Sequence, residues 1–150
     1  MATQGAPDDH VDRLALRALV DAYAAAADGR DVDRFVGLFL PDATLSARRG
    51  DGSPAVYTGA ARLAEIPERL GRYRHTFHDI GHQWAEIAGD RATGEVGCRA
   101  HHITDHEEVA IDLVLTIRYR DVYARTPAGW RFASRDVHIV WTTEEPVTVL

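Results

Sequence analysis

The first part of the chain carries apolar residues at helical spacing. Between residues 11 and 26 they recur every three or four positions, as in an amphipathic helix with one buried face. Asp8 or Asp9 is suited to begin this helix as an N-cap. Gly29 is expected to end it in a left-handed backbone conformation.

Two shorter helices and two short strands are predicted next. Apolar positions after Asp31 fit a helix that ends at Pro41. A third helix, residues 60–70, contains Pro67 and should be short or kinked there. The predicted short strands are residues 43–48 and 55–58.

After Tyr73 the apolar period changes from helical to alternating, which predicts long strands. These are residues 76–87, 91–104, 109–124 and 130–142. Helices followed by antiparallel strands predict an α+β domain, with the helices on one face of a strongly curved sheet. The expected divisions are a flexible arm at 1–7, a single domain at 8–142 and a C-terminal tail at 143–150.

Composition excludes several classes of partner. The net charge of −6 and the scattered arginines argue against nucleic acid. Cys98 is the only cysteine, so no intramolecular disulfide is expected. The N-terminal sequence lacks the pattern of a secretion signal, and no apolar run approaches the length of a membrane span. A cytoplasmic protein that contacts neither membrane nor nucleic acid is therefore expected.

The predicted hairpin of residues 76–104 gathers histidines on one face. With a three-residue turn at 88–90, small residues oppose bulky ones, and His102 lies diagonal to His78 on the inner face while His101 points outward. A slip of one residue would exchange His101 for His102. The even-numbered residues expected on the inner face of the first strand are His78, Ile80, His82, Trp84 and Glu86.

Metal and cofactor sites are not predicted. His78, His82, His102 and His106 form a conceivable metal cluster, but no carboxylate pattern completes a ligand set, so no metal is expected. The nucleotide-binding glycine motifs are also absent from the sequence, so no cofactor is expected.

Three further polar residues stand in apolar patterns. Asp28 lies where the first helix ends, and its charge meets the negative end of the helix dipole. It is either a solvated loop residue or the partner of a histidine. Tyr23 lies on the apolar stripe, typical of a core residue whose hydroxyl reaches a polar partner. Arg135 shares an apolar strand face and needs an anion, either Asp121 or a bound substrate.

Three segments of the chain resemble the SnoaL-like branch of the nuclear-transport-factor-2-like superfamily. They are LVDAYAAAADGRDVDRFVGLFLPDA, HDIGHQWAEIAGDRATGE and RYRDVYARTPAGWRFASRDV. The resemblance implies a cone of a curved sheet and about three N-terminal helices around an apolar pocket, commonly in a homodimer or homotrimer. It also implies an aspartate–histidine dyad like that of scytalone dehydratase, the bile-acid dehydratases and hexachlorocyclohexane dehydrochlorinase.

The resemblance assigns roles to individual residues. Asp28 and His78 match the dyad, Tyr23 matches the tyrosine of the dehydratases, and Arg135 matches the pocket arginine of the dehydrochlorinase. His102 is similar in placement to the second histidine of scytalone dehydratase. The residues expected to line the substrate pocket are Arg135, His82, Trp84 and Cys98. His82 departs from the asparagine that is common in related chains.

These expectations combine into a function. A cofactor-independent, dehydratase-type lyase would act on a small, mostly apolar, oxygenated cyclic substrate. His78 would take the proton, Tyr23 would bind the substrate oxygen, and His102 would protonate the departing hydroxyl. Two alternatives stay open: a polyketide- or steroid-like cyclase or isomerase in which Asp28 takes the proton, and a protein that binds a small ligand without turning it over.

Overall fold

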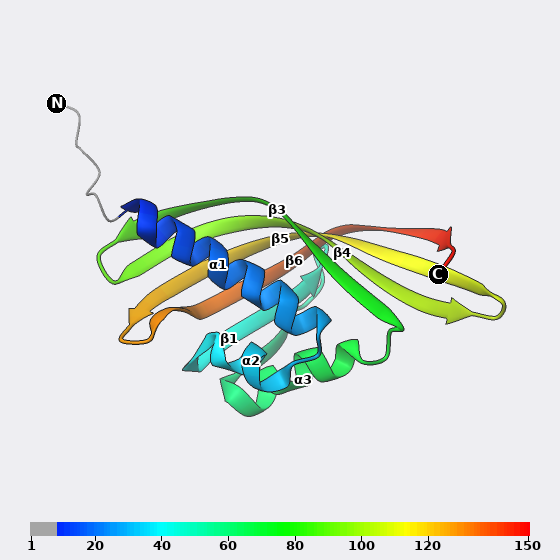
Figure 1. Ribbon diagram of the computed structural model, residues 1–150, viewed down its shortest axis with the longest axis horizontal. Helices are drawn as coiled ribbons and strands as arrows, with labels where there is room; N and C mark the ends of the chain where they lie inside the picture. The colour runs from blue at the N-terminus through cyan, green and yellow to red at the C-terminus, as the bar shows by residue number, and fades with distance from the viewer. Residues whose placement is uncertain (1–8) are drawn as a thin grey trace.

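The computed structural model describes residues 9–150, which form three helices and one six-stranded sheet (Figure 1). The helices are α1 (Asp9–Asp28), α2 (Val32–Gly37) and α3 (Gly59–Leu70). The strands are β1 (Phe39–Arg49), β2 (Ala55–Thr58), β3 (His75–Ala88), β4 (Arg91–His106), β5 (Val109–Thr126) and β6 (Gly129–Val147). The predicted arm at 1–7 lies outside the described residues.

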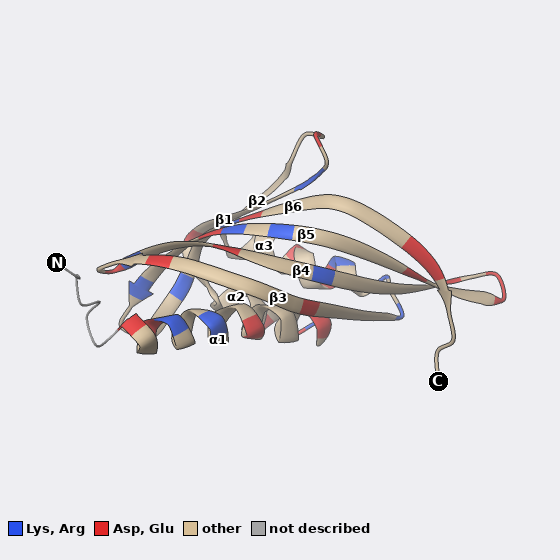
Figure 2. Cartoon of the chain, turned by 90° about the horizontal axis from the view of Figure 1, so that it is seen from above, with Lys and Arg blue, Asp and Glu red and all other residues tan. Residues whose placement is uncertain are grey.

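The sheet is curved and open, with strand order β2-β1-β6-β5-β4-β3. All neighbouring strands are antiparallel except β1 and β6, which run parallel. The helices lie on one face of the sheet, called here the inner face, while the outer face carries none (Figures 1 and 2). The predicted α+β class is confirmed. None of the helices within residues 9–150 is long and apolar enough to cross a membrane.

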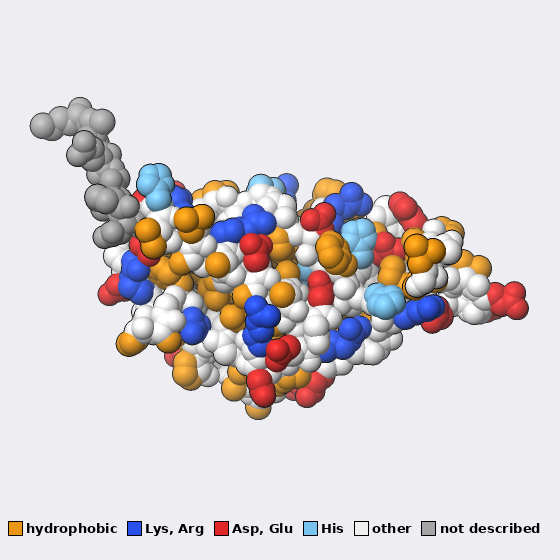
Figure 3. Space-filling view, in the orientation of Figure 1, with side chains coloured by type: hydrophobic (Ala, Val, Ile, Leu, Met, Phe, Trp, Pro, Cys, Tyr) orange, Lys and Arg blue, Asp and Glu red, His pale blue; other side chains and the backbone are white. Residues whose placement is uncertain are grey.

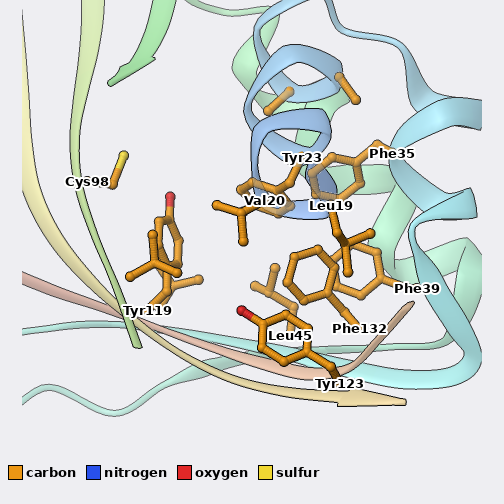
Figure 4. Close-up of a cluster of buried hydrophobic side chains, with 14 of the residues drawn as sticks. Leu19, Val20, Tyr23, Phe35, Phe39, Leu45, Cys98, Tyr119, Tyr123 and Phe132 are labelled. Carbon is orange, nitrogen blue, oxygen red and sulfur yellow. The ribbon is translucent and has the colours of Figure 1, made fainter. Parts of the chain in front are cut away.

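The core lies between α1, α2 and the inner face of the sheet. The apolar stripe of α1 is buried there, including Leu16, Val20 and Tyr23. Aromatic rings fill much of the space, with Tyr23 packed 5.0 Å from Phe35 and 5.9 Å from Phe132, measured between ring centroids (Figure 4). Tilted and edge-on rings at these separations stabilise a core beyond the burial of their area.

The start of α1 is fixed to the strands by a buried carboxylate. Asp12 accepts hydrogen bonds from Nη1 and Nη2 of Arg125 at 2.7 and 2.8 Å, and from Nε1 of Trp130 at 2.9 Å. Its negative charge also lies in the first turn, where the helix dipole favours an anion. At the other end of α1, the left-handed conformation occurs at Arg30, with φ of 52°, and the expectation that Gly29 adopts it is wrong.

The strands begin earlier or end later than the sequence pattern predicts. α2 ends at Gly37, and Pro41 lies inside β1 instead of terminating a helix. Helix α3 ends at Leu70, as predicted, with Pro67 inside it. β6 runs to Val147 and pairs with β5 up to that residue, so most of the predicted tail at 143–150 is strand. Backbone pairing with a long neighbouring strand extends β1 and β6 beyond the positions at which their apolar residues alternate.

The β3–β4 hairpin corrects the predicted register over half its length. His78 pairs with Ala100 and Ile80 with Cys98 as expected, but beyond a bulge Trp84 pairs with Glu95 and not with Gly94. The bulge falls between Ile80 and Gln83. One additional residue there exchanges the faces of the strand, so odd-numbered residues point inward beyond it.

Candidate functional site

Asp28 and His78 form a doubly hydrogen-bonded pair beneath the sheet. Asp28 is the last residue of α1, and His78 lies in β3. The carboxylate accepts one hydrogen bond from the ring at Nδ1 (2.7 Å to Oδ1) and another from the backbone N–H of the same histidine (2.8 Å to Oδ2). Of the two alternatives for Asp28, the structure shows the partner of a histidine, and the histidine is the one that the family resemblance implies.

The pair is mostly buried but still reaches solvent. The His78 side chain is 8% exposed and that of Asp28 21%. Burial raises the pKa of Asp28, but the hydrogen bonds from His78 outweigh it and lower that pKa below its ordinary value. Figure 3 shows histidine and acidic side chains at the surface beyond the end of α1, near the start of β3. The carboxylate is therefore ionised at neutral pH and orients the ring, which leaves Nε2 free.

His102 faces the same site from β4. Its ring centroid lies 5.9 Å from that of His78, and the residue is buried. Burial first, and then the charge of His78, lower the pKa of His102. His101 is turned to the other face, where its Nδ1 lies 2.6 Å from Oδ2 of Asp112. The structure thus selects His102 as the inward histidine of the two.

Arg135 belongs to a neighbouring, fully buried group. Its Nε and Nη2 donate to Asp121 at 2.7 and 2.9 Å, and the hydroxyl of Tyr123 donates to the same carboxylate at 2.7 Å. The guanidinium carbon also lies 3.9 Å from the ring centroid of Tyr119 and 4.2 Å from that of Tyr23. Asp121 is therefore the anion that Arg135 required. Its Nη1 is buried and has no hydrogen-bond partner among the described residues.

Tyr23 and Cys98 lie with Arg135 and make no hydrogen bond to the dyad within residues 9–150. Burial raises the pKa of Tyr23 to about 12, so its hydroxyl stays protonated and can donate. Burial also raises the pKa of Cys98 to about 11, so its thiol is neutral and a poor nucleophile. The six inward candidates form two groups. The imidazole group consists of Asp28, His78 and His102. The second set lies among aromatic rings and is called here the aromatic group; it consists of Tyr23, Cys98 and Arg135.

Two predicted pocket residues lie outside the interior. Trp84 is 47% exposed, and His82 is also exposed. The expectation that both face the substrate is wrong, because the bulge in β3 turns them to the outer face. There His82 and Trp141 line a shallow groove of about 290 Å³.

Sequence reasoning missed two interior polar residues. Thr76 lies opposite His102 on the inner face, and its buried Oγ1 has no hydrogen-bond partner among the described residues. The same alternation that placed His78 inward would have found Thr76. Gln83 also has a buried, unpartnered amide nitrogen. Gln83 points inward only because of the bulge in β3, and nothing in the sequence indicates that bulge.

Within residues 9–150, no three His, Cys, Asp or Glu side chains converge as metal ligands would. The arrangement around the dyad instead suits proton transfer. An ionised carboxylate fixes one imidazole, and a second imidazole lies close by in a largely dry environment.

A family model and a related protein each match most of the chain. A family model described as the SnoaL-like domain matches residues 9–136. An uncharacterized protein of Mycobacterium tuberculosis is 29% identical over 126 residues, which cover 83% of this chain and 82% of that protein.

Solved structures share the fold at low sequence identity. A candidate scytalone dehydratase from Novosphingobium aromaticivorans is 20% identical with a TM-score of 0.77, and the alignment covers 93% of this chain and 91% of that one. A hexachlorocyclohexane dehydrochlorinase from Novosphingobium barchaimii is 19% identical with a TM-score of 0.72, covering 95% and 97%. At these identities the likeness establishes the fold alone.

Proposed function

The chain belongs to the SnoaL-like domain family, and from that premise we propose that it is a cofactor-independent lyase of the dehydratase type. Its substrate would be a small, mostly apolar, oxygenated ring compound. The observation that carries the proposal is the double hydrogen bond between Asp28 and His78. The names of two structural neighbours, a dehydratase and a dehydrochlorinase, both describe eliminations.

His78 would act as the general base. Its Nδ1 carries the hydrogen that faces Asp28, so Nε2 presents a lone pair to the substrate. When Nε2 takes a proton from carbon, the ring becomes an imidazolium whose charge the adjacent carboxylate stabilises. The electron pair of the broken C–H bond forms the new double bond, and the leaving group departs with its own bonding pair.

The aromatic group supplies the donors that an electron-rich substrate oxygen requires. Tyr23 stays protonated because burial raises its pKa to about 12. The Nη1 amino group of Arg135 has no hydrogen-bond partner among the described residues. Donors held in a dry environment stabilise developing negative charge more than donors in water. We propose that this group binds the substrate oxygen while His78 removes the proton.

A cyclase or isomerase that uses Asp28 as its base is less well supported. The carboxylate already accepts two hydrogen bonds from His78, and these lower its pKa. A carboxylate in this condition is a weak proton acceptor. A protein that binds its ligand without turnover remains an outcome of the test below.

The proposal can be tested with cyclic β-hydroxyketones such as 3-hydroxycyclohexanone, by following the ultraviolet absorbance of the enone product. His78→Gln should lower the rate by about 10²–10⁴-fold while the protein stays folded. His101→Gln is the matched control, because His101 also pairs with an aspartate but on the outer face. Near-parental turnover in His78→Gln would refute the dyad role, and binding without turnover in the parent would favour a carrier.

We also propose that the chain forms a homodimer or homotrimer. Three aromatic side chains of the outer face are well exposed: Phe77 at 62%, Trp84 at 47% and Trp141 at 57%. Large apolar side chains that share a face often mark a protein contact. Sedimentation equilibrium at micromolar concentration should give a multiple of 16.6 kDa, and a single species of that mass would exclude the association.

A further inference from the structure

His102 is held in one orientation by two backbone carbonyls. Its Nδ1 lies 3.1 Å from the oxygen of Ala100 and 3.2 Å from that of Leu113. Carbonyl oxygens only accept hydrogen bonds, so Nδ1 must carry the hydrogen. In the neutral ring, Nε2 then has a lone pair and can only accept. The same strand position could have presented an N–H group to the site if these carbonyls had been absent.

The surroundings of His102 favour the neutral ring. The residue is only 5% exposed, and the ring of Tyr73 packs against it at 4.7 Å between centroids. The titratable groups that face it are His78 on β3, backed by Asp28 on α1, and Asp112 on β5. The nearer carboxylate, Asp112, accepts the backbone N–H of His102 and is shared with His101. Burial is the largest cause that lowers the pKa of His102, and a positive charge on His78 lowers it further whenever that ring is protonated.

We propose that His102 is a specificity-determining residue that accepts a hydrogen bond from a hydroxyl group of the substrate. This inference rests on the proposed function for the presence of a substrate beside the dyad. It replaces the role of general acid that the family resemblance suggested, because a neutral ring with its hydrogen on Nδ1 has no proton at Nε2 to give. The substrate is accordingly an uncharged ring compound that offers a hydroxyl donor.

The proton balance of an elimination closes without His102 as an acid. His78 gains a proton from carbon at Nε2, and the C–H electron pair forms the double bond. The C–O bond breaks with its electron pair on oxygen, which takes the proton back from the His78 imidazolium and leaves as water. His78 ends neutral, as it began, and His102 holds the hydroxyl by hydrogen bonding throughout.

The tautomer can be measured without any substrate. Long-range ¹H–¹⁵N correlation spectra of the ligand-free protein, with His102 assigned through His102→Gln, report which ring nitrogen carries hydrogen. We expect the Nδ1–H tautomer at pH 7 and a titration below the ordinary range of histidine. A ring with hydrogen on Nε2, or one that is charged at pH 7, would overturn the inference whatever the protein catalyses.

Binding of two matched probes tests the recognised group. The parent protein should bind 2-naphthol about 10-fold more tightly than 2-methoxynaphthalene, which lacks the hydroxyl donor. His102→Gln keeps a carbonyl acceptor near the place of Nε2 and should retain the preference. His102→Asn can still reach the two backbone carbonyls but ends short of Nε2, and should lose it. A parent protein that binds neither probe, or both equally, would overturn the role, whereas loss of turnover in His78→Gln tests only the dyad.

Discussion

The inner face of the sheet holds two acid–base pairs of similar geometry and different environment. Asp28 and His78 meet at 2.7 Å with side chains 21% and 8% exposed. Asp121 and Arg135 also meet at 2.7 Å, but both side chains are 0% exposed. The first pair is accessible to solvent, whereas the second is shielded from it.

The two pairs also differ in their basic side chain, which is a histidine in the partly exposed pair and an arginine in the fully buried pair. Burial alone would lower the pKa of Arg135, but the carboxylate of Asp121 raises it, so the guanidinium stays charged at any pH at which the protein folds. An imidazole changes charge within the physiological range, and a carboxylate partner stabilises its charged form. One pair thus fixes the aromatic group in place, while the other is suited to move protons.

Breaking the buried pair should have the largest effect on stability. Asp121→Asn leaves a buried guanidinium without its counter-ion, and should reduce the free energy of unfolding by about 3–5 kcal/mol. Urea denaturation followed by circular dichroism measures this loss. If the single variant does not fold, Asp121→Leu combined with Arg135→Met removes both charges and should restore folding. A loss under about 1 kcal/mol would mean that the pair is not desolvated as described.

Replacing a third carboxylate, that of Asp12 near the start of α1, should have the next largest effect on stability. Asp12→Asn weakens three hydrogen bonds and should cost about 1–3 kcal/mol at pH 7. The hydrogen bonds from Arg125 and Trp130 lower the pKa of Asp12 to about 2. A lowered pKa stabilises the fold above the ordinary value of 3.8, and the stabilisation is lost as pH falls towards 2. The difference in free energy of unfolding between parent and Asp12→Asn, measured by urea denaturation, should therefore shrink as pH falls from 3.8 towards 2. A difference that stays constant over this range would contradict the lowered pKa of Asp12.

Asp28→Asn should separate stability from activity. The amide oxygen keeps one acceptor for His78, so the free energy of unfolding should fall by only about 0.5–1.5 kcal/mol at pH 7. Since the hydrogen bonds from His78 lower the pKa of Asp28, this loss should fade in acid as the parent carboxylate protonates. Turnover, in contrast, should fall nearly as far as in His78→Gln, and the double variant should lose little more. Additive losses in rate would show that the two residues do not act as one unit.

The smallest combined effect on stability and turnover is expected at the edge of the buried pair. Tyr123→Phe removes the hydroxyl that donates to Asp121 but leaves both hydrogen bonds from Arg135. The free energy of unfolding should fall by about 0.5–1.5 kcal/mol, with turnover unchanged. A loss as large as that of Asp121→Asn would show that the tyrosine, and not the arginine, satisfies the carboxylate.

The pairing of Asp28 with His78 was implied by the family resemblance, and the apolar pattern predicted where both residues lie better than it predicted their surroundings. Helical spacing located the end of α1 at Asp28, and strand alternation turned His78 and His102 to the inner face. Beyond Ile80 the alternation failed for Trp84, because a bulge adds one residue without any change in apolar character. The role of His102 was beyond the sequence for another reason. Its tautomer depends on a carbonyl of β5, which only the folded sheet brings within reach.

The contacts that α1 makes near its two ends constrain its length. Near its start, Arg13 donates to the carbonyl oxygen of Ala85 and Arg17 to that of Gly81, both on β3. At its end, Asp28 binds His78 on the same strand. The helix is therefore attached to one strand both near its start and at its end. Inserting a single residue into the helix between these two attachments would rotate Asp28 by about 100° about the helix axis and shift it by about 1.5 Å along that axis. Relatives that keep the dyad should therefore vary the composition of this stretch of helix far more readily than its length.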